Sequence, residues 1–347
     1  MASSTPNDRM QLDKNSSSLP RRRDLPQIPG APEGAAWFWG VEDELGRVNL
    51  ITPARVKEAA KEVLSGDVVP LNLELNELQP ACFARSKFQH TIKDLHGQLV
   101  FDDFYTMNTQ SSTQWDGLRH FSHLETGTFY NGVKGGDIIG PDAGSKCGIH
   151  AWAQHGIVAR GVLLDFATYA EAHGISIDYY ENDKITYAAL VDVGKLQGID
   201  IRPESQGGDI KVGDVLLIRS GFLKNYRSID TAERIKKHSG SGVHGPETKQ
   251  RYAGVEQSED ILDWLHDCYF SGMAGDAPAF EAWPSHQKYY LHEHILALWG
   301  CPLGELWDLE KLAEKCKERK RWTFLLTSSP ANVTGGVGSH PNAMAIL

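Results

Sequence analysis

The chain has 347 residues, of which 41% are hydrophobic, 23% charged and 9% aromatic, and this composition excludes a mostly disordered or fibrous protein. Lysine and arginine number 35 against 45 aspartate and glutamate residues, and the formal net charge of −10 without a basic block argues against a protein that binds nucleic acid or an anionic membrane. The five cysteines are widely spaced and never form CxxC, which argues against a disulfide scaffold, and no apolar run approaches the roughly 20 residues of a membrane span.

Residues 1–35 are rich in serine, proline, asparagine and charge, and they lack the apolar stretch of a secretory signal. A segment of this composition cannot form a core by itself. We therefore expect a flexible leader, or an arm laid on a partner subunit, followed by one domain over residues 36–347. The absence of a signal predicts a cytoplasmic protein.

The first regular elements are expected soon after this leader. Thr52 as N-cap, Pro53 at the first helical position and Gly66 as a stop predict a helix that ends at this glycine. The alternating VVPLNLELN predicts a strand over 68–76. The runs GIVARGVLLDFA (156–167) and DVLLIRSGF (214–222) are nearly continuous in aliphatic residues, as in strands buried on both faces.

Helical and strand patterns then alternate to the end of the chain. Helices are expected within 179–199, 258–270, 291–300 and 304–319, and strands within 271–277 and 322–331. The glycine-rich stretches 134–148 and 334–342 lack a nucleotide-binding pattern and are expected to form turns or a flap. The interleaved elements, without repeats, predict a single α/β domain.

Polar side chains recur at alternate positions of the segment NTQSSTQWDGLRHFSH (108–123). Gln110, Ser112, Gln114, Asp116 and His120 all have even numbers, so an extended chain over 110–116 would place them on one face. Because such groups are costly to bury unpaired, we expect either an exposed edge strand or the lining of a polar cleft.

The D-x-x-x-H-F pattern of Asp116, His120 and Phe121 resembles part of the motif H-x-G-T-H-x-D-x-P-x-H-F of the cyclase family, which includes bacterial kynurenine formamidase and isatin hydrolase. The similarity continues through MAGDAP (273–278), LHEHILALWGCPLGELWDL (291–309) and GGVGSHPNAMAIL (335–347). This resemblance implies the swivelling β/β/α fold, an α/β architecture, over a single domain. It also implies a homodimer or homotetramer.

The resemblance further implies a metal site, although two of the family's ligand positions differ in this chain. Family members bind zinc or manganese through two motif histidines and the aspartate, whereas this chain has Gln110 and Gln114 at the histidine positions. Amide oxygens suit harder cations such as Mg²⁺ or Mn²⁺ better than zinc. The remaining ligands are Asp116, Glu305 and His292, with His294 as the alternative histidine. One divalent ion (Mn²⁺, Zn²⁺ or Mg²⁺) is expected there, and a pocket without metal is the alternative.

The family pattern assigns the catalytic roles to His120, Asp116 and Glu305. His120 would be the general acid and base, because an imidazole with a pKa near 6.5 takes and returns a proton at neutral pH, and Asp116 would orient it. Substrate binding is assigned to residues that flank these groups in sequence or align with family positions, namely Gln110, Gln114, Trp115, Arg119 and Asp276.

These expectations describe a hydrolase that acts on a small molecule, either a cyclic or aryl amide or a lactone. One alternative is a metal-independent lyase, dehydratase or ring-closing cyclase that uses the same pocket. The other alternative is a binding protein without catalytic activity.

Overall fold

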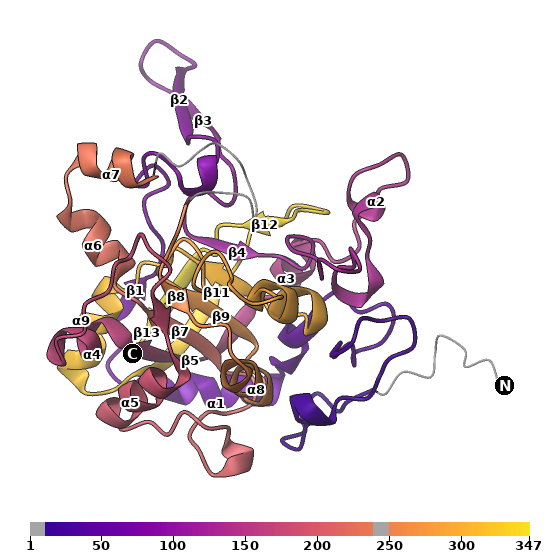
Figure 1. The fold of residues 1–347 in the computed structure, drawn as a ribbon. Helices are drawn as coiled ribbons and strands as arrows, with labels where there is room; N and C mark the ends of the chain where they lie inside the picture. The colour runs from indigo at the N-terminus through magenta and orange to yellow at the C-terminus, as the bar shows by residue number, and fades with distance from the viewer. Residues whose placement is uncertain (1–10, 239–249) are drawn as a thin grey trace.

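The computed structural model describes residues 11–238 and 250–347, which are built around a nine-stranded mixed sheet (Figure 1). The sheet has the order β1-β13-β11-β5-β7-β9-β10-β4-β12. Its strands are β1 Val68–Pro70, β4 Gln114–Asp116, β5 Ile157–Asp165, β7 Val215–Arg219, β9 Gly272–Gly275, β10 Leu303–Glu305, β11 Thr323–Ser328, β12 Gly338–Ser339 and β13 Ala343–Ile346. Two further pairs are β2 Gln89–Asp94 with β3 Phe101–Thr106, and β6 Lys184–Ile185 with β8 Gly254–Val255.

The helices are short and lie between the strands in sequence. They are α1 Pro53–Ala59, α2 Gly135–Ile138, α3 His150–His155, α4 Phe166–Ala172, α5 Tyr187–Gln197, α6 Phe222–Ser228, α7 Thr231–His238, α8 Glu259–Asp267 and α9 Glu310–Arg319, with a π-helical turn at Glu293–Leu298. Among the described residues, no helix is both long and apolar enough to cross a membrane.

The centre of the sheet is a parallel run of β5, β7, β9 and β10. Every residue of β7 and β9 is buried, because α1, α4 and α5 cover β5 and β7 and other segments enclose the rest. The continuous aliphatic runs therefore predicted β5 and β7 correctly. The predicted helix starts at 53 and 259 are also confirmed, because Thr52 and Ser258 accept hydrogen bonds from the backbone of the first turn.

Several element boundaries differ from the predictions. The first helix ends as α1 at Ala59, followed by a 3₁₀ turn, and the strand expected over 68–76 is only β1. The residues Gly304 and Glu305, expected to begin a helix, belong to β10. Pairing with β9 and β4, which lie far away in sequence, holds this short segment extended.

The first described residues pack on their own chain. Arg22 forms ion pairs with Glu259 and Asp263 of α8, and the hydroxyl of Tyr269 donates to Pro20 O at 2.7 Å. Arg22 and Pro20 thus contact α8 and Tyr269 through pairs that composition does not encode. The flexible leader or partner-bound arm expected over residues 1–35 stays a prediction. Residues 1–10 lie outside the described part of the chain.

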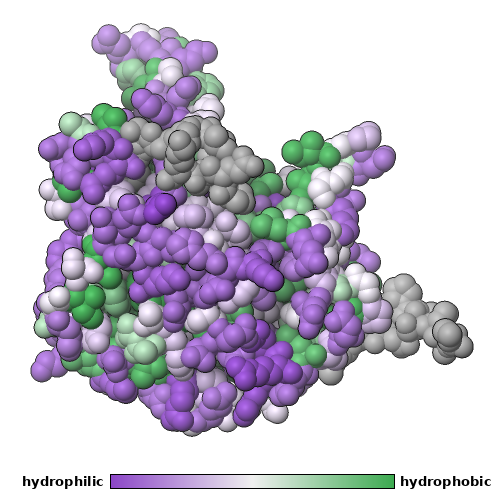
Figure 2. Space-filling view, viewed as in Figure 1, coloured by the Kyte–Doolittle hydropathy of each residue, from purple (hydrophilic) through white to green (hydrophobic). Residues whose placement is uncertain are grey.

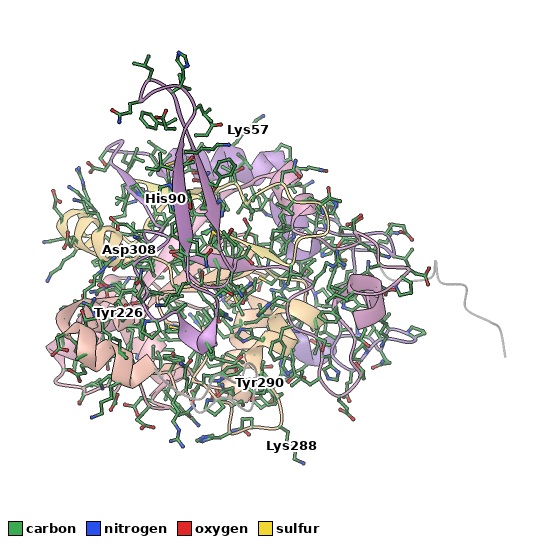
Figure 3. The ribbon with its side chains drawn as sticks, turned by 90° about the horizontal axis from the view of Figure 1, so that it is seen from above. Lys57, His90, Tyr226, Lys288, Tyr290 and Asp308 are labelled. Carbon is green, nitrogen blue, oxygen red and sulfur yellow. The ribbon has the colours of Figure 1, made fainter. Side chains whose placement is uncertain are left out.

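The β2–β3 hairpin projects from the body of the molecule, and every residue of both strands is exposed (Figures 1 and 3). His90, labelled in Figure 3, contacts Asp103 across the pair at 3.0 Å. Phe101, Phe104 and Tyr105 are each more than half exposed. The face in Figure 2 is mostly hydrophilic, with hydrophobic side chains on this hairpin and near α2.

Candidate active site

Strands β4 and β10 bring the polar residues of the site together. The two strands are antiparallel, with Glu305 opposite Gln114 and Leu303 opposite Asp116. Alternation along β4 places Gln114 and Asp116 on one face and Trp115 on the other. The amide of Gln114 donates from Nε2 to Glu305 Oε2 at 2.8 Å. The expected common face is therefore confirmed for residues 114 and 116, whereas 110–113 form a turn and bends.

His292 joins this cluster from the segment that leads into the π-helical turn. Its Nε2 lies 3.1 Å from Glu305 Oε1 and 3.8 Å from Asp116 Oδ2. His294 packs instead against Tyr289 and Trp299, at ring-centroid distances of 5.1 and 5.6 Å. Of the two histidines, His292 is therefore the one that lies with Asp116 and Glu305.

Asp116, His292 and Glu305 are the one set of three such side chains, within the described ranges, that could hold a metal ion. One ligand atom from each lies within 4.8 Å of the others, and all three residues are buried. Two carboxylates and an imidazole suit several divalent cations. This arrangement is the one that the family resemblance implies.

Unpartnered polar atoms surround the three residues. Asp116 Oδ2, Gln114 Oε1 and both amide atoms of Gln110 are buried and have no hydrogen-bond partner in the described part of the structure. A buried oxygen without a partner costs about 1–3 kcal/mol, and more when it is charged. Three of these four atoms are oxygens that can donate lone pairs to a cation. The donor set therefore fits a divalent metal ion.

The electrostatics also favour a positive charge here. Burial, followed by the negative charge of Glu305, raises the pKa of Asp116 above its ordinary value. Burial opposes protonation of His292, but hydrogen bonds with Glu281 and Glu305 raise its pKa above the ordinary value. Both shifts reflect carboxylates that are crowded together away from water. A divalent cation bound here would likewise stabilise the negative charges of these carboxylates.

A cavity of about 350 Å³ opens beside these ligands. That volume suits a small molecule. Its lining includes His292 and Glu305 together with His120, whose Nε2 lies 3.9 Å from Asp116 Oδ2. This distance is too long for a direct hydrogen bond, so Asp116 does not orient His120 in this structure. Burial, followed by the positive charges of Arg85 and His292, lowers the pKa of His120 to about 3.

Aromatic rings form much of the remaining wall. Phe83, Phe121 and Trp283 line the cavity. Trp283 packs at 4.9 Å from Tyr290, which is labelled in Figure 3, and Phe121 packs at 5.2 Å from His292. Phe83 and Arg85, which also line the cavity, were missed because no motif surrounds them.

Of the five expected substrate-binding residues, Gln110 lines the cavity, Gln114 reaches it only through Glu305, and the other three lie elsewhere. Trp115 is fully buried, stacks edge-on against Trp307 and donates to Ser328. The buried Arg119 donates to the carbonyls of Gly335, Asp137 and Gly144, so it joins the two glycine-rich stretches. Asp276 accepts hydrogen bonds from Ser220 and the backbone of Gly221. None of the three lines the cavity.

Two environments were expected for residues 110–116, an exposed edge strand or the lining of a polar cleft, and the structure excludes the first. All residues from Gln110 to Asp116 are buried, and β4 lies between β10 and β12. Alternating polar residues are typical of a strand with one face in solvent, but here the polar side chains face an internal polar cluster. Sequence alone cannot distinguish these two environments when the partners come from distant segments.

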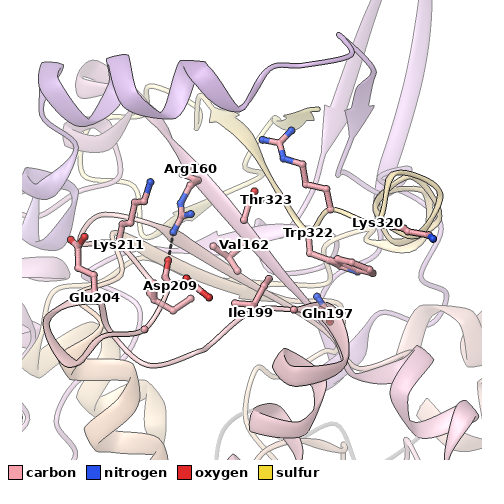
Figure 4. Close-up of a pocket in the computed structure, with 14 residues that line it drawn as sticks. Arg160, Val162, Gln197, Ile199, Glu204, Asp209, Lys211, Lys320, Trp322 and Thr323 are labelled. Carbon is pink, nitrogen blue, oxygen red and sulfur yellow. Dashed lines mark hydrogen bonds between the residues drawn. The ribbon is translucent and has the colours of Figure 1, made fainter.

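A larger cavity of about 470 Å³ lies away from the cluster, between the residues shown in Figure 4. Its arginines already have partners. Arg160 pairs with Asp214 and donates to the carbonyl of Asp209, and Arg321 pairs with Glu62. Among the described residues, neither a histidine nor a cysteine lines it. The smaller cavity is therefore the better candidate for a catalytic site.

Glu281 is the residue that orients His292, and sequence reasoning missed it. Its buried carboxylate accepts from His292 Nδ1 at 2.7 Å, from the backbone of Leu291 and His292, and from Gln257 Nε2 at 2.7 Å. A carboxylate on the far nitrogen fixes the imidazole so that Nε2 faces the other ligands.

Glu281→Ala is expected to lower the free energy of unfolding by about 3–5 kcal/mol, because it leaves a buried imidazole and three other donors without their acceptor. Urea denaturation checks this value. Glu171→Ala, which removes a carboxylate whose side chain is 58% exposed, is the control and should change stability by less than about 0.5 kcal/mol. Equal small losses in both variants would contradict the orienting role.

Comparisons with known proteins show which family and which solved structures this chain is similar to. A family described as "Putative cyclase" matches residues 69–282, which is more than half of the chain. No curated protein matches the sequence. A crystal structure described as a novel cyclase is 28% identical, with a TM-score of 0.75, over 90% of this chain and 99% of that one.

Two isatin hydrolases share the fold at lower identity. One, bound to the product analogue thioisatinate, is 14% identical with a TM-score of 0.52, over 84% of this chain and 95% of that one. Isatin hydrolase A from Ralstonia solanacearum is 15% identical with a TM-score of 0.51, over 85% of this chain and 98% of that one. The expected α/β fold class is confirmed.

Proposed function

This chain belongs to the cyclase family, and from that premise we propose that it hydrolyses a cyclic or aryl amide, or a lactone, with one divalent metal ion in the 350 Å³ cavity. The observation that carries the proposal is the buried set of Asp116, His292 and Glu305 beside that cavity, with ligand atoms within 4.8 Å of one another. The isatin hydrolase that shares the fold was solved with a product analogue, which supports a cyclic amide as the substrate class.

Asp116, His292 and Glu305 would hold the metal. When bound, a divalent ion supplies a Lewis acid for the carbonyl and makes water a better nucleophile at neutral pH. Glu281 holds His292 through Nδ1, and Gln114 holds Glu305 through Oε2, so both ligands are oriented before a metal binds.

His120 would move the proton in this reaction. It lines the cavity close to Asp116 Oδ2, and 21% of its side chain is exposed. Because its pKa is lowered to about 3, the imidazole is neutral at pH 7 and a weak base, so at Nε2 it can accept a hydrogen bond from the attacking water. Once it has taken the proton, it would return it readily to the leaving nitrogen or oxygen. The aromatic walls would hold a flat substrate and limit the access of water to the reacting bond.

One observation favours the second candidate, a metal-independent dehydration or ring closure. Both amide atoms of Gln110 are buried and unpartnered within the described structure, and the residue lines the cavity. Its NH₂ group could donate to a substrate oxygen, while His120 moves the proton. Activity that persists after complete removal of metal would select this candidate.

Replacing Gln110 and Gln114 together by histidine is expected to raise zinc affinity by at least about tenfold, because imidazole nitrogen is a better zinc ligand than an amide oxygen. Calorimetric titration of the wild type and the double variant with Zn²⁺ measures the change. A control variant, Gln197→His, lies outside the site and should leave affinity unchanged. Equal zinc affinity in all three proteins would show that positions 110 and 114 do not face the metal.

The proposed activity is tested with a panel of cyclic amides, lactones and N-formyl aryl amines, each assayed with and without Mn²⁺ or Zn²⁺. We expect at least one class to be hydrolysed only when the metal is present. Hydrolysis that does not depend on metal, or dehydration in place of hydrolysis, would overturn the proposal in favour of the second candidate. Tight binding of a panel member without turnover would favour a non-catalytic protein.

A further inference from the structure

Among the described lysine and arginine residues, Arg85 is the one whose side chain lines the cavity. Its Nη1 donates to the carbonyl of Gln110 at 2.8 Å, and its guanidinium carbon lies 5.0 Å from the centre of the Phe83 ring. These two contacts fix the plane of the guanidinium. No carboxylate forms an ion pair with Arg85 within residues 11–238 and 250–347.

Arg85 also has fewer partners than several other arginines of the fold. Arg160, Arg219 and Arg227 each pair with one or two carboxylates. Arg55 and Arg119 pair with no carboxylate of the described residues, but each donates to three backbone carbonyls. A guanidinium has five N–H donors, and the recorded bond of Arg85 uses one of them. The cavity therefore presents a fixed cation with free donors.

The rest of the cavity has the opposite character. The lining also includes the carboxylate of Glu305, which lies close to Asp116, and the rings of Phe83, Phe121 and Trp283. An anionic group on a ligand is repelled by these carboxylates and attracted by Arg85. A flat apolar group fits against the rings.

We infer that Arg85 binds a carboxylate of the substrate, so that the substrate class is a flat, unsaturated or aromatic carboxylic acid. This inference rests on the proposed function for the bond that reacts, but the binding of the carboxylate does not depend on turnover. A guanidinium holds a carboxylate with two parallel hydrogen bonds, which lysine cannot reproduce. Arg85 thereby acts as a positioning residue that directs the reacting bond towards His120.

The test compares two probes of nearly equal shape, 2-naphthoate and its neutral amide, 2-naphthamide. Binding of each is measured by calorimetry to the full-length wild type, Arg85→Met, Arg85→Lys and the control Arg202→Met, whose arginine is exposed and pairs with Asp200. We expect Arg85→Met to weaken naphthoate binding by roughly 10–100-fold and to change naphthamide binding by less than about threefold. Arg85→Lys should fall between the two, and Arg202→Met should match the wild type.

Failure of the wild type to prefer the carboxylate, or equal loss of both probes in Arg85→Met, would overturn the inference. Thermal denaturation of each variant separates a folding defect from a loss of binding, and Arg85→Lys retains the charge if the methionine variant is unstable. Preference for the carboxylate without hydrolysis of any panel compound would leave this inference standing and contradict only the proposed function.

Discussion

Replacing His120 by asparagine is expected to lower turnover of a hydrolysed panel compound by roughly 10²–10⁴-fold, the usual contribution of a positioned acid–base group. Asparagine retains a polar side chain at the cavity but cannot accept and return a proton near neutral pH. The fold should remain intact, because no hydrogen bond of the His120 side chain is recorded in the described structure. Steady-state kinetics with a circular dichroism spectrum of each variant checks both statements.

His123→Asn is the matched control for this experiment. His123 lies three residues further on, contacts Thr126 Oγ1 at 3.0 Å and does not line the cavity. Its replacement should change turnover by less than about threefold. If His120→Asn retained near wild-type turnover, the proton-transfer role would be wrong, and Glu305 would become the first candidate for it.

Removal of metal by a chelator is expected to lower hydrolysis by about 10³-fold, because Lewis-acid stabilisation contributes several kcal/mol to the transition state. Addition of Mn²⁺ or Zn²⁺ should restore the rate. The protein should stay folded, since Glu281 and Gln114 hold His292 and Glu305 without a metal. Parallel measurements of rate, metal content and circular dichroism check this prediction.

The same treatment applied to the Glu281→Gln variant tests the orienting carboxylate. Glutamine can accept a hydrogen bond but carries no charge, so restoration should need roughly 10–100 times more metal. A wild-type rate that survives complete removal of metal would contradict the metal-assisted reaction. It would support the alternative in which Gln110 and His120 act without a metal.

The centre of the fold could be predicted from the sequence because its strands are locally unambiguous. The aliphatic runs of β5 and β7 are typical of strands that are buried on both faces. Thr52 and Ser258 indicate the helix starts because they accept hydrogen bonds from nearby backbone N–H groups. Strand β10 could not be predicted in this way. Its three residues are held extended by β9 and β4, and its own pattern fits a helix.

The residues of the candidate site could be predicted only where the family resemblance identifies them. Asp116, His120, His292 and Glu305 were identified through the family motif, and the structure places them around one cavity or beside it. Glu281 could not be found, because its role depends on a contact with His292 that no spacing rule describes. Trp115 and Arg119 were assigned to the pocket only because they are adjacent in sequence to site residues. Alternation and buried carbonyl contacts direct both side chains away from it.

The most direct test of the account is the stoichiometry of divalent metal bound to the wild type and to Glu305→Gln, measured by calorimetry and elemental analysis on metal-free protein. Glutamine preserves the size of residue 305 and can still accept the hydrogen bond from Phe280 N. Its NH₂ group can donate to the unpartnered Oε1 of Gln114 once that amide turns over, so we expect the fold to be retained while one anionic ligand is lost. The account predicts one Mn²⁺ or Zn²⁺ ion per wild-type chain and at least about tenfold weaker binding to the variant. A wild type that takes up no metal, or a variant that binds it equally well, would contradict the assignment of Asp116, His292 and Glu305 as a metal site.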